Sequence, residues 1–204
     1  MGLYARYVLP WILDATMRQD MLNPYRHRLA AQARGRVLEI GMGSALNLPH
    51  YREAATEIVG LEPSSPLLAK ARSAIAGSSR RVVLIEGSAE AIPLDAHSVD
   101  TVLTTWTLCS IPNVAAALTE ARRVLRPGGQ FLFVEHGRSP DAGVVRWQDR
   151  LTPLWTRIAG GCHLNRPIQA LVEEAGFRVE QIDAAYMTGP RPLTYMYEGR
   201  ATPR

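Results

Sequence analysis

The stretch VLEIGMGSALN, residues 37–47, decides the predicted fold. Residues 37–40 are mostly apolar and predict a short buried strand, which Gly41 and Gly43 follow immediately. Gly41 allows the chain to turn tightly, and Gly43 lets the backbone approach a ligand because no Cβ stands in the way. A strand that ends in such a turn is typical of the first βα unit of an open α/β sheet, which binds ligands beyond the carboxyl ends of its strands.

Short β-rich runs alternate with helical patterns from residue 36 onward. The predicted strands cover residues 37–40, 57–62, 82–87, 99–106, 131–136, 177–184 and 194–199. The predicted helices cover about residues 64–76, 113–125 and 166–175, and Asn113 is the expected cap of the second. Strands that alternate with helices in this way predict parallel βαβ units.

The linker between the last two predicted strands is short and contains the turn residues Thr188, Gly189 and Pro190. It is too short for a crossover helix, so these strands are expected to form an antiparallel hairpin. The predicted fold is therefore α/β: a Rossmann-like, doubly wound, mostly parallel seven-stranded sheet with an antiparallel hairpin strand at its edge.

The glycine turn suits a cofactor without phosphates better than a dinucleotide. The third glycine of a dinucleotide fingerprint would fall at position 46, which is Leu46. Glu39 stands just before the turn, where a carboxylate would repel a pyrophosphate and attract an ammonium group. An NAD-dependent oxidoreductase on a similar sheet is the alternative that these two residues disfavour.

Glu62 ends the second predicted strand and is followed by Pro63. An acidic residue about 20 positions beyond the glycine turn can accept hydrogen bonds from both hydroxyls of a ribose. The alternative is that Glu62 is a surface carboxylate with no ligand. A ribose role does not separate NAD from a cofactor such as S-adenosylmethionine (SAM), since both carry an adenine-linked ribose.

A series of motifs in one order resembles a known enzyme family. The motifs are VLEIGMGSALN (37–47), GLEPS (60–64), GSAEAIPL (87–94), SVDTVLTTWTLCSIPN (98–113) and ARRVLRPGGQFLFVEH (121–136). Together they resemble the class I SAM-dependent methyltransferases, of the type-11 subgroup, over about residues 36–136. One departure is Ala45, where many relatives carry glycine.

The resemblance implies a SAM-dependent methyltransferase and places its cofactor residues. Glu39, Gly41 and Gly43 would surround the methionine part of SAM, and Glu62 with Pro63 would hold the ribose. The segment Ser88, Ala89 and Glu90 would lie along the adenine. The residues that would border the methyl group and the acceptor are Thr105 and Trp106. A SAM-binding protein that has lost catalysis is the non-enzyme alternative.

A narrower resemblance concerns the acceptor. The segments TLCS (107–110), EHGR (135–138), WQDRLTPLW (147–155) and GCHLNR (161–166) resemble a methyltransferase-like branch that includes thiol S-methyltransferases. The resemblance implies a small, fairly apolar acceptor and S-methylation of a thiol. The alternative is N- or O-methylation of a small molecule or of a phospholipid headgroup such as phosphatidylethanolamine, because related proteins carry such names.

His136 is the candidate catalytic residue. It follows the fifth predicted strand at the ligand-binding end, where an imidazole can take a proton near neutral pH. A structural role in a hydrogen bond to the backbone is the alternative, and it is favoured for His163. The spacing of Cys109, Cys162 and these two histidines matches no zinc pattern, so no metal site is predicted.

The composition limits the other partners. The net charge of +4 comes with scattered arginines and no basic run, so a nucleic-acid partner is not expected. Two cysteines without a CxxC pair fit a cytoplasmic location.

Residues 1–35 are expected to form an N-terminal helical segment that covers the site, and residues 36–204 the SAM-dependent methyltransferase domain. The apolar face Tyr4, Tyr7, Val8, Trp11, Ile12 and Ala15 is expected to pack on the domain, with peripheral membrane contact as the alternative.

Overall fold

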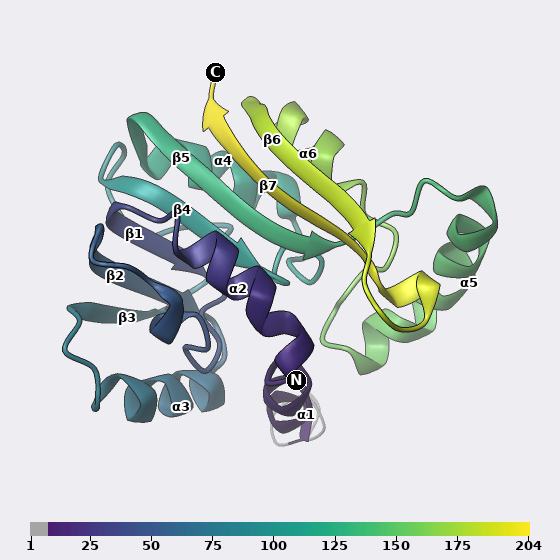
Figure 1. Cartoon of the computed structure of the whole chain (residues 1–204), viewed down its shortest axis with the longest axis horizontal. Helices are drawn as coiled ribbons and strands as arrows, with labels where there is room; N and C mark the ends of the chain where they lie inside the picture. The colour runs from purple at the N-terminus through teal and green to yellow at the C-terminus, as the bar shows by residue number, and fades with distance from the viewer. Residues whose placement is uncertain (1–7) are drawn as a thin grey trace.

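A computed structural model describes residues 8–204 of the chain, so Tyr4 and Tyr7 lie outside the described residues. It contains a seven-stranded sheet in the order β3-β2-β1-β4-β5-β7-β6 (Figure 1). The strands are β1 (Gly35–Ile40), β2 (Ala55–Glu62), β3 (Val82–Glu86), β4 (Val99–Thr105), β5 (Leu125–His136), β6 (Phe177–Tyr186) and β7 (Tyr195–Pro203). The helices are α1 (Leu9–Met17), α2 (Asn23–Ala30), α3 (Ser65–Ile75), α4 (Val114–Val124), α5 (Ala142–Ile158) and α6 (Ile168–Glu174).

The predicted fold class is confirmed. Strands β3, β2, β1, β4 and β5 pair in parallel, whereas β7 pairs antiparallel with both β5 and β6. The short β6–β7 connection forces this reversal, because a parallel return needs a crossover of a dozen or more residues. The carboxyl ends of the parallel strands consequently meet at one edge of the sheet, and this edge carries the site.

Apolar side chains cover both faces of the sheet. Leu38 belongs to the core under α4 and α6, whereas its neighbour Val37 belongs to a second core that includes Leu29 of α2. Successive side chains of a strand point to opposite faces, so a strand buried on both sides must be apolar throughout. This explains why the predicted strands are short continuous apolar runs.

The three predicted helices are confirmed as α3, α4 and α6, and Asn113 caps α4 by accepting a hydrogen bond from the Ala116 N–H at 3.1 Å. The sequence pattern missed α5. Its buried residues are the polar Gln148 and Thr152, while Trp147 is 56% exposed. Its apolar residues Trp147, Leu151, Leu154 and Ile158 fall at helical spacing, but they lie on the exposed face of the helix.

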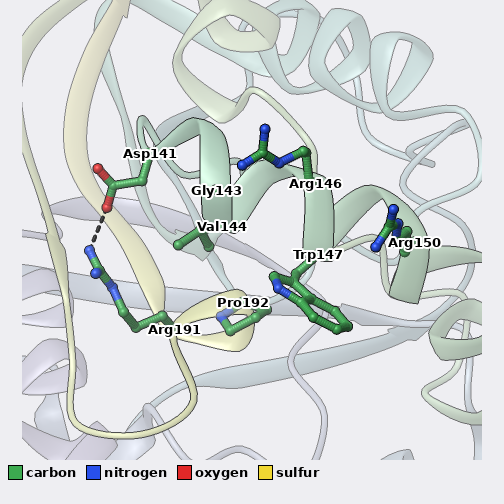
Figure 2. Close-up of a pocket in the computed structure, with 8 residues that line it drawn as sticks. All are labelled: Asp141, Gly143, Val144, Arg146, Trp147, Arg150, Arg191 and Pro192. Atoms are coloured by element: carbon green, nitrogen blue, oxygen red, sulfur yellow. Dashed lines mark hydrogen bonds and ion pairs between the residues drawn. The ribbon is translucent and has the colours of Figure 1, made fainter.

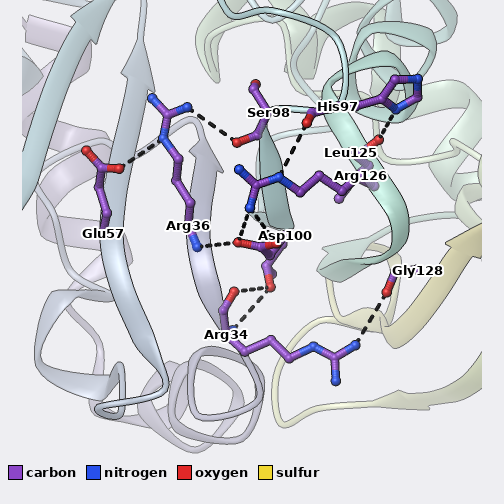
Figure 3. A network of polar contacts seen from close by, with 10 residues as sticks. Arg34, Arg36, Glu57, His97, Ser98, Asp100, Leu125, Arg126 and Gly128 are labelled. Atoms are coloured by element: carbon purple, nitrogen blue, oxygen red, sulfur yellow. Dashed lines mark hydrogen bonds and ion pairs between the residues drawn. The ribbon is translucent and has the colours of Figure 1, made fainter.

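Polar contacts join the amino ends of the strands, opposite the site (Figure 3). Asp100 at the start of β4 accepts from the Arg36 backbone N–H at 2.8 Å and pairs with the Arg126 guanidinium at 2.8 Å. Gly35 has a positive φ of 63°, and a Cβ there would overlap the Asp100 carboxylate. Several of the scattered arginines therefore hold the sheet together from its far end.

Candidate active site

The loop after β1 alternates in and out of the left-handed region. Gly41, Gly43 and Ala45 have φ values of 70°, 58° and 63°. The Gly41 N–H donates to the Leu61 carbonyl at 2.8 Å, which fixes the turn against β2. Ala45 adopts a conformation that is unfavourable for a residue with a Cβ by about 1–2 kcal/mol. The loop therefore keeps a left-handed conformation at position 45 even though alanine replaces glycine there.

Glu62 joins this loop to the end of β2. One carboxylate oxygen accepts from the Gly43 N–H at 3.0 Å, and the other accepts from the Ser64 N–H at 2.9 Å. Burial raises the pKa of Glu62 above its ordinary value, although both backbone hydrogen bonds oppose this. The structure therefore brings the predicted ribose carboxylate and the glycine turn into direct contact.

Glu39 lies fully buried beneath the same loop. Its two oxygens accept hydrogen bonds from the Asn47 side-chain amide at 2.8 Å and from the Tyr51 hydroxyl at 2.7 Å. Burial raises the pKa of Glu39 to about 7, although both hydrogen bonds lower it. Glu39 thus holds the far end of the loop in place, and its contact with a cofactor ammonium stays a prediction.

Sequence reasoning did not find the partners of Glu39. Asn47 also donates to the Thr105 hydroxyl at 3.1 Å and accepts from the Arg26 guanidinium at 2.9 Å. It therefore links the loop to the end of β4 and to α2. Asn47 ends the quoted motif, but a buried amide gives no sequence signal of its own.

Helix α1 lies over the loop. Asp14 accepts hydrogen bonds from the Ser44 hydroxyl and from Lys70 Nζ, the latter at 2.7 Å. Burial raises the pKa of Asp14, but hydrogen bonds from Lys70, Ser44 and Arg18 outweigh it and lower the pKa to about 2. A cavity of about 60 Å³ remains between α1, Gly41, Gly43 and Thr105.

The described residues of the predicted apolar face are largely exposed, although Lys70 Nζ lies 3.8 Å from the centre of the Trp11 ring. Val8, Trp11 and Ile12 are 46%, 66% and 47% exposed, whereas Pro10 and Asp14 are buried. The helix contacts the loop through the opposite face, because the Asp14 carboxylate finds both a hydroxyl and an ammonium there. The helix therefore lies over the loop through Asp14, while the described residues of the apolar face stay largely exposed.

The remaining predicted cofactor residues lie along the same edge. Gly87 donates to the Glu62 carbonyl at 3.3 Å, which places the following Ser88–Glu90 segment beside the end of β2. Ala89 is buried in the core and Pro63 is exposed. The Trp106 indole lies against Arg26, whose guanidinium carbon is 4.8 Å from the ring centre. Trp106 itself has a φ of 51° as the chain leaves β4.

His136 lies at the carboxyl end of β5. Its Nε2 is 3.0 Å from the sulfur of Cys162. Burial lowers the pKa of His136, but the charge of Cys109, a hydrogen bond to that thiol and the charge of Glu135 outweigh burial and raise the pKa above its ordinary value. His163 Nδ1 instead lies 3.3 Å from the Cys109 carbonyl. This is a contact with the backbone, the structural role that the sequence favoured for His163. Only His136 of the two therefore contacts a chemically reactive side chain.

A wider cavity than the one beneath α1 lies elsewhere on the described part of the chain. It has a volume of about 560 Å³ and lies between α5 and the Arg191–Leu193 turn (Figure 2). Trp147 and Pro192 line it, and Arg191 pairs with Asp141 at its edge (Figure 2). None of the predicted site residues lines this depression, so its size does not make it the active site.

Comparison with known proteins gives the family. Residues 38–133 match a family model described as a methyltransferase domain, and this segment includes both the glycine turn and Glu62. This match and the relatives below support a class I SAM-dependent methyltransferase. SAM is the cosubstrate of this methyltransferase, which decides against the NAD-dependent alternative.

Relatives of the methyltransferase include thiol S-methyltransferases. Thiol S-methyltransferase TMT1B of Rattus norvegicus is 39% identical over 87 residues, which are 42% of this chain and 36% of that protein. The Homo sapiens TMT1B is 29% identical over 188 residues, 89% of this chain and 74% of that protein. The chain thus spans about a third of the rat relative and about three quarters of the human one in these matches.

Solved structures agree with the fold. An S-adenosylmethionine-dependent methyltransferase from Mesorhizobium loti has a TM-score of 0.66 at 19% identity, over 91% of this chain and 99% of that chain. Within residues 8–204, no helix has both the length and the apolar character needed to cross a bilayer.

Proposed function

We propose that the protein transfers the methyl group of SAM to the sulfur of a small, fairly apolar thiol. The observation that carries the proposal is the contact between Glu62 and the Gly43 N–H, which makes one cradle from the ends of β1 and β2. The choice of a thiol rests on the printed names of relatives that match up to 89% of this chain.

The residues of the cradle fit a nucleoside with an amino-acid tail. Among residues 8–204, a Cβ on Gly43 would have only the Gly41 carbonyl within 4.0 Å, so Gly43 faces space that a ligand can enter. The Glu62 oxygens each have acceptor capacity beyond their present backbone bond, which suits two ribose hydroxyls. Ser88, Ala89 and Glu90 follow on the next strand end, as an adenine beyond the ribose requires.

The cavity beneath α1 is smaller than the cofactor. Ligand sites for molecules of drug size measure about 300–1,000 Å³, against about 60 Å³ here. We therefore assign to α1 the role of a cover that moves when SAM enters. The Asp14 contacts with Ser44 and Lys70 are the bonds that this movement would break.

A thiol acceptor needs little base catalysis. Its reference pKa of about 8.5 leaves a usable thiolate fraction near neutrality. Methyl transfer from the sulfonium of SAM is an in-line displacement, so the protein's task is to align the two reactants and exclude water. Thr105 and Trp106, at the end of β4, are the proposed border of this reaction space, and the predicted base role of His136 is not required for it.

Two measurements test the proposal. Calorimetry with S-adenosylhomocysteine should give saturable binding that Gly43→Val abolishes, and absence of binding at millimolar concentration would defeat the SAM cradle. A methyl-transfer screen across thiols, phenols, amines and phosphatidylethanolamine vesicles should give activity on thiols. Activity confined to a non-thiol class would reject the thiol while keeping the methyltransferase.

Membrane contact is part of the same screen. Trp11 and Ile12 of α1 and Leu154 of α5 are exposed, which leaves peripheral contact as a prediction. Cosedimentation with anionic vesicles, compared with Trp11→Ser, measures it. A thiol partitioned into the vesicles would then be methylated faster by the wild type than by the variant.

A further inference from the structure

We propose that Cys109, His136 and Cys162 form a three-ligand site for a thiophilic divalent cation, Zn²⁺ in the first instance. The two sulfurs and one imidazole nitrogen all lie within 4.8 Å of one another. They come from the turn after β4, the end of β5 and the loop after α5. This assignment goes beyond methyl transfer and does not depend on which acceptor the protein uses.

The donor set is one that zinc prefers. Two thiolates and a neutral imidazole are ligands of Zn²⁺, with Zn–S bonds of about 2.3 Å and Zn–N bonds of about 2.0–2.1 Å. Tetrahedral geometry with these bonds places the donor atoms about 3.5–3.8 Å apart. The present 3.0 Å between His136 Nε2 and Cys162 Sγ, and the limit of 4.8 Å for the set, require shifts of about 1 Å or less.

The loops that carry the two cysteines are tied together before any ion binds. The His163 N–H donates to the Cys109 carbonyl at 2.8 Å. Arg166 bridges the same loops, because its guanidinium donates to the carbonyls of Leu108 and Ile111. A site whose ligands are already positioned loses less conformational entropy on binding.

Two glycines turn the second loop back toward β5. Gly160 and Gly161 have φ values of 64° and 85°, a conformation that suits glycine. A Cβ on Gly161 would lie 3.1 Å from the Ser110 carbonyl, so the two loops approach closely at this point. The sharp turn is what brings the Cys162 sulfur to the His136 ring.

The surroundings suit a buried cation held by thiolates. The Trp155 indole N–H donates to the Cys162 sulfur at 3.2 Å, a bond that a zinc-bound thiolate accepts well. Cys109 is 2% exposed and Cys162 is 9% exposed. Two thiolates and Zn²⁺ sum to zero charge, so the occupied site would bury no net charge.

The other charged groups beside the cluster are Glu135 and Arg166. Glu135 is fully buried and one of its oxygens, Oε2, has no hydrogen-bond partner among residues 8–204. The Nδ1 atom of His136 is also without a partner in the same part of the chain, so Nε2 is the ring nitrogen that faces the sulfurs.

Three protein ligands leave a fourth position, and the cluster occupies the edge of the sheet that carries Thr105 and Trp106. Zinc sites with three protein ligands and one open position are typical of catalytic rather than structural zinc. Coordination through Nε2 would also replace the predicted base role of His136. The two roles differ in a measurable way, since a base variant keeps its metal and a ligand variant loses it.

The test is metal content and cobalt spectroscopy on the full chain. Protein purified under reducing conditions and supplied with Zn²⁺ should retain about one ion per chain after desalting. Cys109→Ser, Cys162→Ser and His136→Ala should each weaken Zn²⁺ binding at least about tenfold. The matched control is His163→Ala, the histidine next to Cys162 whose ring contacts backbone, and it should keep its zinc.

Replacement of Zn²⁺ by Co²⁺ in the wild type should produce the visible bands of tetrahedral cobalt and a sulfur-to-cobalt charge-transfer band. This measurement does not depend on whether a variant folds. Fully reduced wild-type protein that retains neither metal, or zinc that survives loss of either cysteine, would overturn the proposal. So would a Cys109–Cys162 disulfide found by mass spectrometry in protein prepared under reducing conditions. S-Adenosylhomocysteine binding reports on the cradle separately from all of these results.

Discussion

Gly41→Ala should mainly lower the stability of the protein, whereas Gly43→Ala should mainly weaken cofactor binding. Both glycines have positive φ, so both variants incur backbone strain of about 1–2 kcal/mol. The surroundings of the added methyl group differ. A Cβ on Gly41 would lie 2.3 Å from Thr107 Oγ1 and 2.4 Å from its Cγ2, whereas a Cβ on Gly43 would face open space.

The magnitudes follow from these contacts. Replacing glycine also restricts the unfolded chain, which returns about 0.4–1 kcal/mol of stability. Gly43→Ala should therefore lose about 1 kcal/mol of unfolding free energy. Gly41→Ala adds an overpacking cost of about 1–3 kcal/mol and should lose roughly 2–4 kcal/mol. In a chain of this size the melting temperature would fall by about 2–4 °C and about 4–16 °C, respectively.

The assay combines thermal unfolding with calorimetry of S-adenosylhomocysteine binding. Gly43→Ala should fold almost normally and bind at least about tenfold more weakly, because the methyl group enters the ligand space. Gly41→Ala should unfold early, and adding Thr107→Ala should restore part of the loss by removing the Oγ1 and Cγ2 contacts. Equal destabilisation by both alanines, or unchanged binding by Gly43→Ala, would refute the reasoning.

Three further variants test the Glu62 carboxylate, the Asp14 contacts and the cap of α4. Glu62→Ala should weaken S-adenosylhomocysteine binding by about 1–3 kcal/mol, or about 5- to 150-fold in the dissociation constant, because charged hydrogen bonds are lost. The pKa of Asp14 is lowered from 3.8 to about 2 on folding, so its contribution to stability is present above about pH 4 and disappears as the pH falls through about 2. Between pH 5 and pH 2, the unfolding free energy measured with urea should therefore fall by up to about 2 kcal/mol more in the wild type than in Asp14→Asn. Asn113→Ala should lose about 1 kcal/mol in urea unfolding at neutral pH, because α4 loses its cap.

Each of these variants has a matched control. Glu86→Ala removes a carboxylate from the neighbouring strand end and should leave cofactor affinity unchanged. Asp20→Asn removes an acidic group that follows α1, and a pH dependence like that of Asp14→Asn would exclude the Asp14 contacts as the cause. Asn113→Asp keeps a capping oxygen, so a loss as large as that of Asn113→Ala would show that the cap is not what stabilises α4.

Two helices show where sequence patterns gave the wrong or no answer. On α1, the apolar residues Val8, Trp11 and Ile12 predicted a packed face, but the helix packs through Asp14. On α5, the residues that face inward are Gln148 and Thr152. In both cases specific hydrogen bonds set the orientation, and hydrophobic periodicity carries no information about those bonds.

The sequence by itself determined the sheet, the glycine turn and the position of Glu62. These features depend on local properties: apolar runs set the strands, positive φ selects glycine, and parallel strands bring their carboxyl ends to one edge. Tertiary structure alone decided that Asn47 holds Glu39 and that Cys109, His136 and Cys162 meet. Their separations of 26 and 27 residues match no metal pattern, because two loops and the end of β5 supply them and only the folded sheet fixes the distances between these segments.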